Sequence, residues 1–180
     1  ANKQEYLETA IKWISKDKIS DYMGLMQKES SANQLWLYFN SVIEWVKTVF
    51  PNYRREMKGI EWGFLYDEFK DKQLDPNELE NKINKYMQDD EIQKKKGIYE
   101  YLLTGNEKFL NLRSFTESQK REMYERQEGK CAIRGEYYPI EEMEADHIRR
   151  WADGGKTVTD VDPEKNNGRM IHKDENRRLG

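Results

Sequence analysis

The chain has 180 residues, of which 36% are charged and 36% hydrophobic, and its formal net charge is −3. This balance argues against a uniformly basic coat for nucleic acid, but it allows a local basic site because binding follows the local potential. A single cysteine excludes an internal disulfide framework and fits a reducing compartment. No apolar run approaches the length of a membrane span and the first residues lack a signal-peptide core, so we expect a cytoplasmic protein without a membrane partner.

The first two-thirds of the chain are expected to form one helix after another. Apolar residues recur at helical spacing in the segments 2–16 and 32–50, and Pro51 ends the second of these. Asp75 followed by Pro76 is typical of an N-cap and a first helical residue, so a further helix is predicted to begin there. We find no internal repeat and no low-complexity linker in this part of the chain.

Five aromatic residues of this helical part have two interpretations. Exposed rings are platforms on which nucleic-acid bases stack, whereas buried rings pack between helices. We favour packing, and we therefore interpret this part of the chain as a scaffold. The residues concerned are Trp36, Trp45, Trp62, Tyr66 and Phe69.

The character of the sequence changes near Gln127. Thr116 and Gln119 form a capping-box pattern ahead of one more helix. Beyond that helix the segment 137–148 is expected to hold one or two short strands, and the segment 169–179 is expected to form a closing helix.

These elements predict a mostly helical α+β fold with two domains. Residues 1–115 are expected to form a helical scaffold domain, and residues 116–180 a small ββα unit. The part of this unit that follows Gln127, about 50 residues long, buries little apolar surface by itself. We therefore expect it to depend on the helical part or on a metal ion for stability.

The segment 144–155, EADHIRRWADGG, suggests phosphodiester hydrolysis. That reaction needs a base that deprotonates water and a cation that stabilises the developing charge. His147 titrates close enough to neutrality to be the base, and Asp146 offers an anionic oxygen to a hard ion such as Mg²⁺. Asn167 can orient the imidazole, and Asn176 can complete the coordination. This hypothesis requires the four side chains to gather around one divalent ion.

Five basic residues lie near these positions in the sequence, and we favour phosphate contacts over a purely solubilising role for them. They are Arg149, Arg150, Lys173, Arg177 and Arg178. Because neighbouring residues of a strand point to opposite faces, Asp146 and His147 can act together only where the strand ends or twists. The pair Gly154–Gly155 favours such an ending.

The pattern DHI-x-x-W-x-x-GG-K followed by N-x-x-M-I-H-x-x-E-N-R-R-x-G resembles the HNH endonucleases, which are ββα-metal nucleases. The resemblance covers residues 116 to 180. It implies that His147 is the general base and that Asn167 fixes it in place. It also implies that Asp146 and Asn176 bind Mg²⁺ or Mn²⁺ and that DNA is cut to leave 5′-phosphate ends.

The preceding helices are similar, more weakly, to those of GmrSD-like restriction proteins. There they lie between an N-terminal nucleotide-hydrolysing ParB-like domain and the HNH domain. The resemblance implies DNA as the partner and a role in restriction or phage defence. It also implies a nucleotide-hydrolysing domain that this chain does not contain. The sequence carries no sign of the oligomeric state.

Many members of the resembled family carry two C-x-x-C pairs that bind a structural zinc ion. The corresponding positions here are Cys131, Arg134, His172 and Glu175. Because arginine is not a zinc ligand and only one sulfur remains, we expect no structural zinc, with a Cys-His-Glu site as the less favoured alternative. We hypothesise that Arg134 and Glu175 form an ion pair instead, and that packing of the helical scaffold replaces the metal.

Two other interpretations of the C-terminal unit remain open. One is a nuclease-inactive relative that binds nucleic acid or protein, since loss of the zinc ligands is compatible with loss of activity. The complete set of Asp146, His147, Asn167 and Asn176 favours the enzyme, because a decayed site would be expected to lose these residues first. The other is a fragment whose activity requires the missing nucleotide-driven domain.

Overall fold

The computed structural model describes residues 3–29 and 31–179, and of Lys3 it describes the backbone alone. The chain divides into two compact units, residues 1–111 and residues 112–180. The boundary lies four residues before the one expected from the sequence. In the described part of the chain, no helix combines the length and the apolar character needed to cross a membrane.

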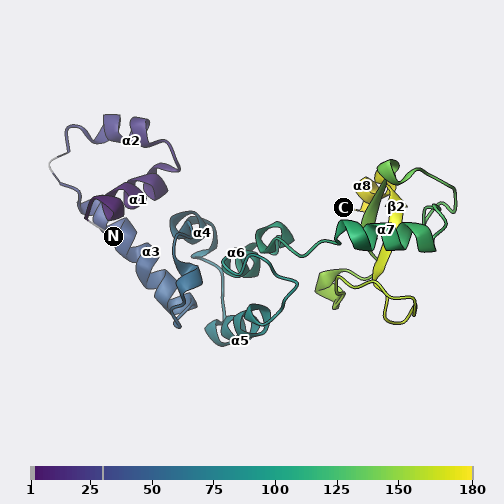
Figure 1. Cartoon of the computed structure of the whole chain (residues 1–180). Helices are drawn as coiled ribbons and strands as arrows, with labels where there is room; N and C mark the ends of the chain where they lie inside the picture. Colours follow the sequence, from purple (N-terminus) through teal and green to yellow (C-terminus); the bar gives the residue numbers. More distant parts are fainter. Residues whose placement is uncertain (1–2, 30, 180) are drawn as a thin grey trace. The chain divides into compact units, whose positions relative to one another are not determined.

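The N-terminal unit consists of helices, as expected from the sequence (Figure 1). Pro51 follows the third helix by two residues, and the expected N-cap is confirmed because the Asp75 carboxylate accepts hydrogen bonds from the backbone N–H groups of Asn77 and Glu78. The α-helices are α1 (Lys3–Ser15), α2 (Ile19–Met26), α3 (Asn33–Val49), α4 (Trp62–Phe69), α5 (Pro76–Met87) and α6 (Gly97–Thr104).

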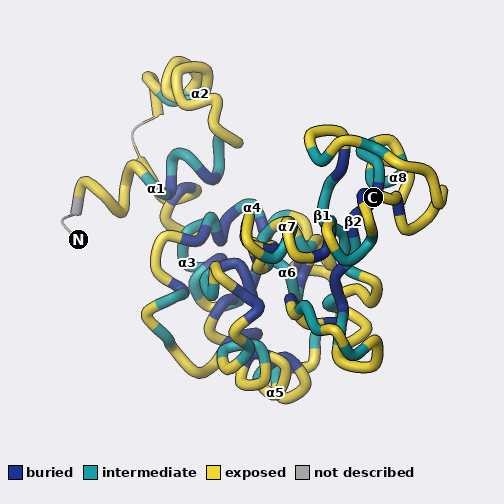
Figure 2. The backbone as a smooth tube through the Cα atoms, turned by 45° about the vertical axis from the view of Figure 1, so that its right-hand side comes forward, coloured by how far each residue is buried: buried dark blue, intermediate teal, exposed yellow. Residues whose placement is uncertain are grey.

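Aromatic packing forms part of the core of this unit. The rings of Phe50, Trp62 and Tyr99 meet edge-on or tilted, with centroids 5.2 to 5.9 Å apart. All three side chains are buried, and Figure 2 shows the dark core segments of α3, α4 and α6 around them. The Arg54–Glu80 ion pair joins the segment before α4 to α5.

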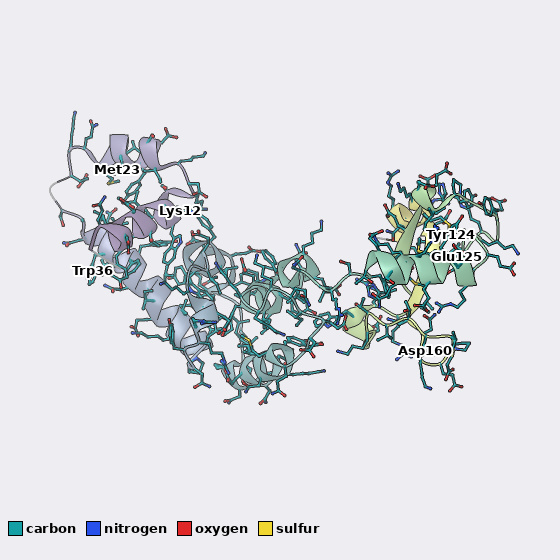
Figure 3. All side chains as sticks on the ribbon, viewed as in Figure 1. Lys12, Met23, Trp36, Tyr124, Glu125 and Asp160 are labelled. Atoms are coloured by element: carbon teal, nitrogen blue, oxygen red, sulfur yellow. The ribbon has the colours of Figure 1, made fainter. Side chains whose placement is uncertain are left out.

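The packing interpretation of the five aromatic residues is correct for four and wrong for one. Trp62 and Phe69 are buried, and Trp45 and Tyr66 make an edge-on ring contact. Trp36 on α3 is 63% exposed, because it lies near the helix start, where α1 covers α3 incompletely (Figure 3). Its helical spacing gave no sign of this difference.

The C-terminal unit is a two-stranded antiparallel sheet with helices, a ββα-like arrangement (Figure 1). Its first helix begins with the expected capping box, in which Thr116 and Gln119 bond reciprocally to each other's backbone. The elements are α7 (Glu117–Arg126), β1 (Met143–His147), β2 (Gly168–His172) and α8 (Lys173–Leu179).

The expectation of a closing helix over 169–179 is wrong at its start, because residues 169–172 belong to β2. The register pairs Met143 with His172 and His147 with Gly168. Met170 and Ile171 are both buried although they point to opposite faces of the sheet. Both faces are therefore covered, so the strand lacks the alternation that identifies a half-exposed strand in a sequence.

The two faces of the hairpin are covered by different helices. Met123 of α7 lies against Gly168, since a Cβ atom built on that glycine would come within 2.4 Å of the methionine sulfur. On the other face, Asn176 of α8 bonds to Glu144 of β1. Between the helices lies a small core, whose buried members are Phe115, Met123, Cys131, Met143, Met170 and Ile171.

Candidate active site

His147 is the last residue of β1 and faces the α7 side of the hairpin. Its ring packs on the Phe115 ring with centroids 4.5 Å apart, and its Nε2 lies 3.0 Å from the Thr157 hydroxyl. That hydroxyl donates its own proton to the Arg113 carbonyl, at 3.1 Å, so it accepts from the imidazole. This arrangement favours a neutral imidazole whose Nε2 carries the proton.

Asp146 faces the α8 side of the hairpin and is paired with an arginine. Its Oδ2 accepts from Nε of Arg169 at 2.7 Å and lies 2.7 Å from the Nη2 nitrogen of the same guanidinium. The two residues are directly opposite in the strand register, and their side chains are 18% and 28% exposed. The carboxylate that the sequence assigned to a metal ion thus has an internal cation as its partner.

Neighbouring residues of β1 point to opposite faces here, and this separates Asp146 from His147. Gly168, the cross-strand partner of His147, faces the Phe115 ring, so His147 shares that face. Arg169, the partner of Asp146, faces the other way. The structure therefore brings Asp146 to the α8 side of the hairpin and His147 to the α7 side, at its loop end. The expectation that all four side chains gather around one position is thus not met, because neighbouring strand residues face opposite ways.

Asn176 lies on the same face as Asp146. Its side-chain nitrogen donates to Oε2 of Glu144 at 2.7 Å, and Glu144 precedes Asp146 by two residues on the strand. Two carboxylates and an amide oxygen are the hard donors that Mg²⁺ prefers. Within the described residues, no group of three or more His, Cys, Asp and Glu side chains is placed to hold a metal ion.

Asn167 holds the backbone that follows His147. It is 8% exposed, and its Oδ1 accepts from the backbone N–H of Arg149 at 2.7 Å. Its Nδ2 donates to the carbonyl oxygens of Arg149 and Lys156, at 3.0 and 2.8 Å. One side chain thus ties both ends of the turn that contains the glycine pair Gly154–Gly155 to the start of β2.

The predicted phosphate contacts lie in two groups. Arg149 and Arg150 are exposed in the loop directly after β1. Lys173 is half-buried at the start of α8, whereas Arg177 and Arg178 are exposed on that helix and pair with the acidic side chains three residues before them. The α8 arginines are thus partly neutralised by their own helix.

The predicted ion pair between Arg134 and Glu175 is present. Nε and Nη2 of Arg134 both donate to Oε1 of Glu175, at 2.8 and 2.6 Å. The pair joins the turn after Cys131 to α8, and the Arg134 guanidinium also donates to the Tyr138 hydroxyl. His172 packs its ring against Tyr138 with centroids 4.5 Å apart.

This cluster does not fit the ligand set of a structural zinc ion. Arg134 is positively charged and occupies the Glu175 carboxylate, so four neutral or anionic donors are not assembled. Cys131 is buried, and its sulfur accepts from the backbone N–H groups of Arg134 and His172 at 3.5 and 3.3 Å. Burial raises the pKa of the Cys131 thiol, but these donors and the Arg134 charge lower it more, so the net shift is downward. The absence of zinc stays a prediction.

Replacement of Glu175 by Gln is expected to lower the melting temperature of the C-terminal unit at neutral pH but not in acid. The Arg134 guanidinium lowers the pKa of Glu175 below its ordinary value of 4.5. A carboxylate with a depressed pKa in the folded state stabilises it above the ordinary pKa, and this contribution disappears as the pH falls through the depressed value. Melting curves of wild type and Glu175→Gln should therefore converge below pH 4.5.

The control for this prediction is Glu117→Gln, which removes a carboxylate from α7 of the same unit. The Glu117 side chain is 89% exposed and pairs only with Lys120 on its own helix. We expect little change at any pH, since exposed pairs contribute little. If the Glu175→Gln difference persisted unchanged into acid, the ion pair would not be its cause.

Three partners of the candidate residues were not identified from the sequence. They are Arg169 for Asp146, Glu144 for Asn176, and Thr157 for His147. The first two depend on strand register and on the placement of α8. The alternation of Glu144 and Asp146 within the expected strand was the one available signal.

A second surface feature lies in the N-terminal unit. An apolar groove of about 500 Å³ runs between α1 and the start of α3, and it includes the exposed ring of Trp36. Met23 of α2 is also exposed in this unit (Figure 3). Trp36 thus lines a groove and is not part of the core.

No protein-family model matches this chain, and neither a curated protein nor a solved structure does.

Proposed function

We propose that the C-terminal unit is a metal-dependent endonuclease that hydrolyses DNA phosphodiester bonds. The observation that carries the proposal is that the Asn167 side chain bonds to the backbone at Arg149, two residues after His147, within a ββα-like unit. A clamp of this kind fixes a base at the end of a strand, where a bound phosphate is accessible. Asp146 on β1 and Asn176 on α8 supply oxygen donors at the same hairpin.

In this proposal His147 accepts the proton of the attacking water at Nδ1. Thr157 and the Phe115 ring hold the imidazole in one orientation and one tautomer. The role of such contacts is to limit the motion of the base, since catalysis depends on geometry before pKa. Because His147 is the last residue of β1, side chains from both faces of the hairpin can reach a phosphate that is bound at this end.

Asp146 and Asn176, with Glu144 beside them, are the residues that would hold a divalent ion. Such an ion supplies positive charge for the phosphate oxygens and the leaving oxygen. Arg169 must release Asp146 for this coordination, and Asn176 must present its amide oxygen to the ion. The bond from Asn176 to Glu144 leaves that oxygen unengaged by Glu144.

A second candidate function is a nucleic-acid-binding or protein-binding module without nuclease activity. It is favoured by the Asp146–Arg169 ion pair and by the position of His147 on the opposite face of the hairpin. In such a module the ion pair is purely structural, and Arg169 never leaves Asp146. The two functions therefore predict different behaviour for variants of this pair.

The test compares Asp146→Asn with Arg169→Gln, which break the same ion pair from its two ends. For the nuclease we expect Asp146→Asn to lose Mn²⁺ binding and nicking of supercoiled plasmid. Arg169→Gln should retain nicking and bind Mn²⁺ about two- to five-fold more tightly, because a partly exposed ion pair contributes about 0.2–1 kcal/mol. Mn²⁺ binding is measured by calorimetry, and nicking with Mg²⁺, with Mn²⁺ and with EDTA.

The outcomes separate the two candidates. Equal melting temperatures of the two variants would show that loss of the ion pair destabilises both variants to the same extent. If both variants behave alike in metal binding and nicking, Asp146 is not a metal ligand. If the wild type neither binds Mn²⁺ nor nicks plasmid, the binding module is the better description of the unit.

A further inference from the structure

The loop between the two strands of the C-terminal unit forms a cleft of about 390 Å³ that the motif does not include. Three cations line it, namely Arg149, Lys156 and Lys165, and Glu164 is the carboxylate among its lining residues. Lys165 also pairs with Asp162 at 3.3 Å, but both side chains are at least 40% exposed, so that pair is weak. The residues that line the cleft therefore include more cations than carboxylates.

The walls of this cleft are held by specific contacts. Asn167 fixes the backbone at Arg149 and Lys156, as described above. Arg126 of α7 donates to the Asp160 carbonyl at 2.7 Å and to Asn166 at 3.0 Å, which ties the far side of the loop to the helix. Because the backbone of the loop is held at both sides, the residues that carry its cations stay at a fixed spacing. This lowers the entropic cost of binding a ligand.

The cleft also has an apolar side. Ile148 and Val158 line it and are 52% and 42% exposed, and Pro163 lies beside them. Inorganic phosphate gains nothing from such groups, whereas the sugar and base of a nucleotide bury apolar surface against them. Cations for phosphate together with apolar groups for a sugar or base fit a nucleic-acid strand.

We propose that this cleft binds a phosphodiester segment of a nucleic-acid strand through Lys156 and Lys165. The site lies at the loop end of the hairpin, since Ile148 directly follows His147 and Asn167 directly precedes β2. A nucleic-acid strand bound in this cleft would run past His147, the candidate general base. This inference rests on the proposed function for its biological meaning, but binding and cleavage can be tested separately.

The test is the binding of a fluorescent DNA oligonucleotide, single- or double-stranded, to the full chain in EDTA, so that no cleavage occurs. The variant carries Lys156→Gln and Lys165→Gln. We expect about 10- to 100-fold weaker binding near 0.1 M salt, because each lost duplex phosphate contact lowers the salt dependence of log K by about 0.9. The slope against log salt should fall by about 1.8 for duplex.

The matched control carries Lys120→Gln and Lys130→Gln, which remove the same charge from the same unit at residues outside the cleft. It should bind as the wild type does. Equal weakening of both double variants would overturn the inference, because net charge alone would explain it. Displacement of the oligonucleotide by millimolar inorganic phosphate at constant ionic strength would also overturn it, because the ligand would then be the free anion.

The two proposals fail in different ways. Loss of binding in the cleft variant, together with a wild type that never nicks plasmid, supports the cleft and contradicts the nuclease. Nicking by the wild type and unchanged oligonucleotide binding by the cleft variant supports the nuclease and contradicts the cleft. Equal melting temperatures of the two double variants ensure that unfolding explains neither result.

Discussion

The His147→Ala variant is expected to nick plasmid about 10²- to 10⁴-fold more slowly than the wild type, which is the contribution typical of a positioned general base. The variant loses the nitrogen that accepts the proton of water. It also loses the packing against Phe115 and the bond to Thr157. A decrease in rate is therefore informative only if the fold persists.

Two further variants make this prediction specific. His147→Gln keeps an amide that can donate to Thr157 but cannot act as a base, so we expect a near-native melting temperature and the same loss of rate. His172→Ala removes the only other histidine, which packs against Tyr138 at the opposite end of β2. It should retain nicking. Equal rates in the wild type and His147→Ala would exclude His147 as the base.

The Asn167→Asp variant is expected to destabilise the C-terminal unit by about 1–3 kcal/mol, the cost of an acceptor that loses its partner, although the two side chains have the same shape. The Asn167 amide donates to two carbonyl oxygens, at Arg149 and Lys156. A carboxylate cannot donate, so the Arg149 carbonyl loses this partner, whereas the Lys156 carbonyl still accepts from the backbone N–H of Val158. Proximity of a negative oxygen to two carbonyl oxygens adds repulsion. We expect nicking to decrease as well, since this loop holds the backbone next to His147.

The measurement is chemical denaturation, followed by amide hydrogen exchange in β1 and β2. In acid the introduced carboxyl can take up a proton and donate again, so the variant should recover part of its stability as the pH falls. Asn166→Asp is the matched neighbour: it also loses one donated bond, to the Gly168 carbonyl, but its oxygen accepts from the Arg126 guanidinium and tolerates a negative charge. We therefore expect a smaller loss than for Asn167→Asp. Equal losses in both variants would contradict a specific role for the Asn167 donors.

Local signals in the sequence predicted much of the fold. The capping residues Asp75 and Thr116 mark helix starts because their side chains satisfy backbone N–H groups a few residues away. β2 was not recognised, since both of its faces are covered and consecutive apolar residues at Met170 and Ile171 fit a helix equally well. Helix capping involves residues a few positions apart and can be predicted from the sequence. Burial of both faces of a strand depends on the tertiary fold.

The sequence predicted which residues belong to the candidate site, but it did not predict which residues they contact. Spacing placed Asp146 and His147 on β1 and Asn176 on the final helix. It did not predict that Arg169 lies opposite Asp146, because strand register depends on how the chain pairs over 23 residues of separation. Nor did it predict Thr157 as the partner of the imidazole, since that contact comes from an irregular loop.

The ion pair between Arg134 and Glu175 has a consequence for how the C-terminal unit matures. A zinc knuckle closes only after the cell delivers an ion and the thiols lose their protons, so a chelator or a shortage of zinc unfolds it. The Arg134 guanidinium and the Glu175 carboxylate are both charged at neutral pH as soon as the chain is synthesised. This ion pair between the turn and α8 therefore responds to acidity and to salt, and it needs no metal ion to form.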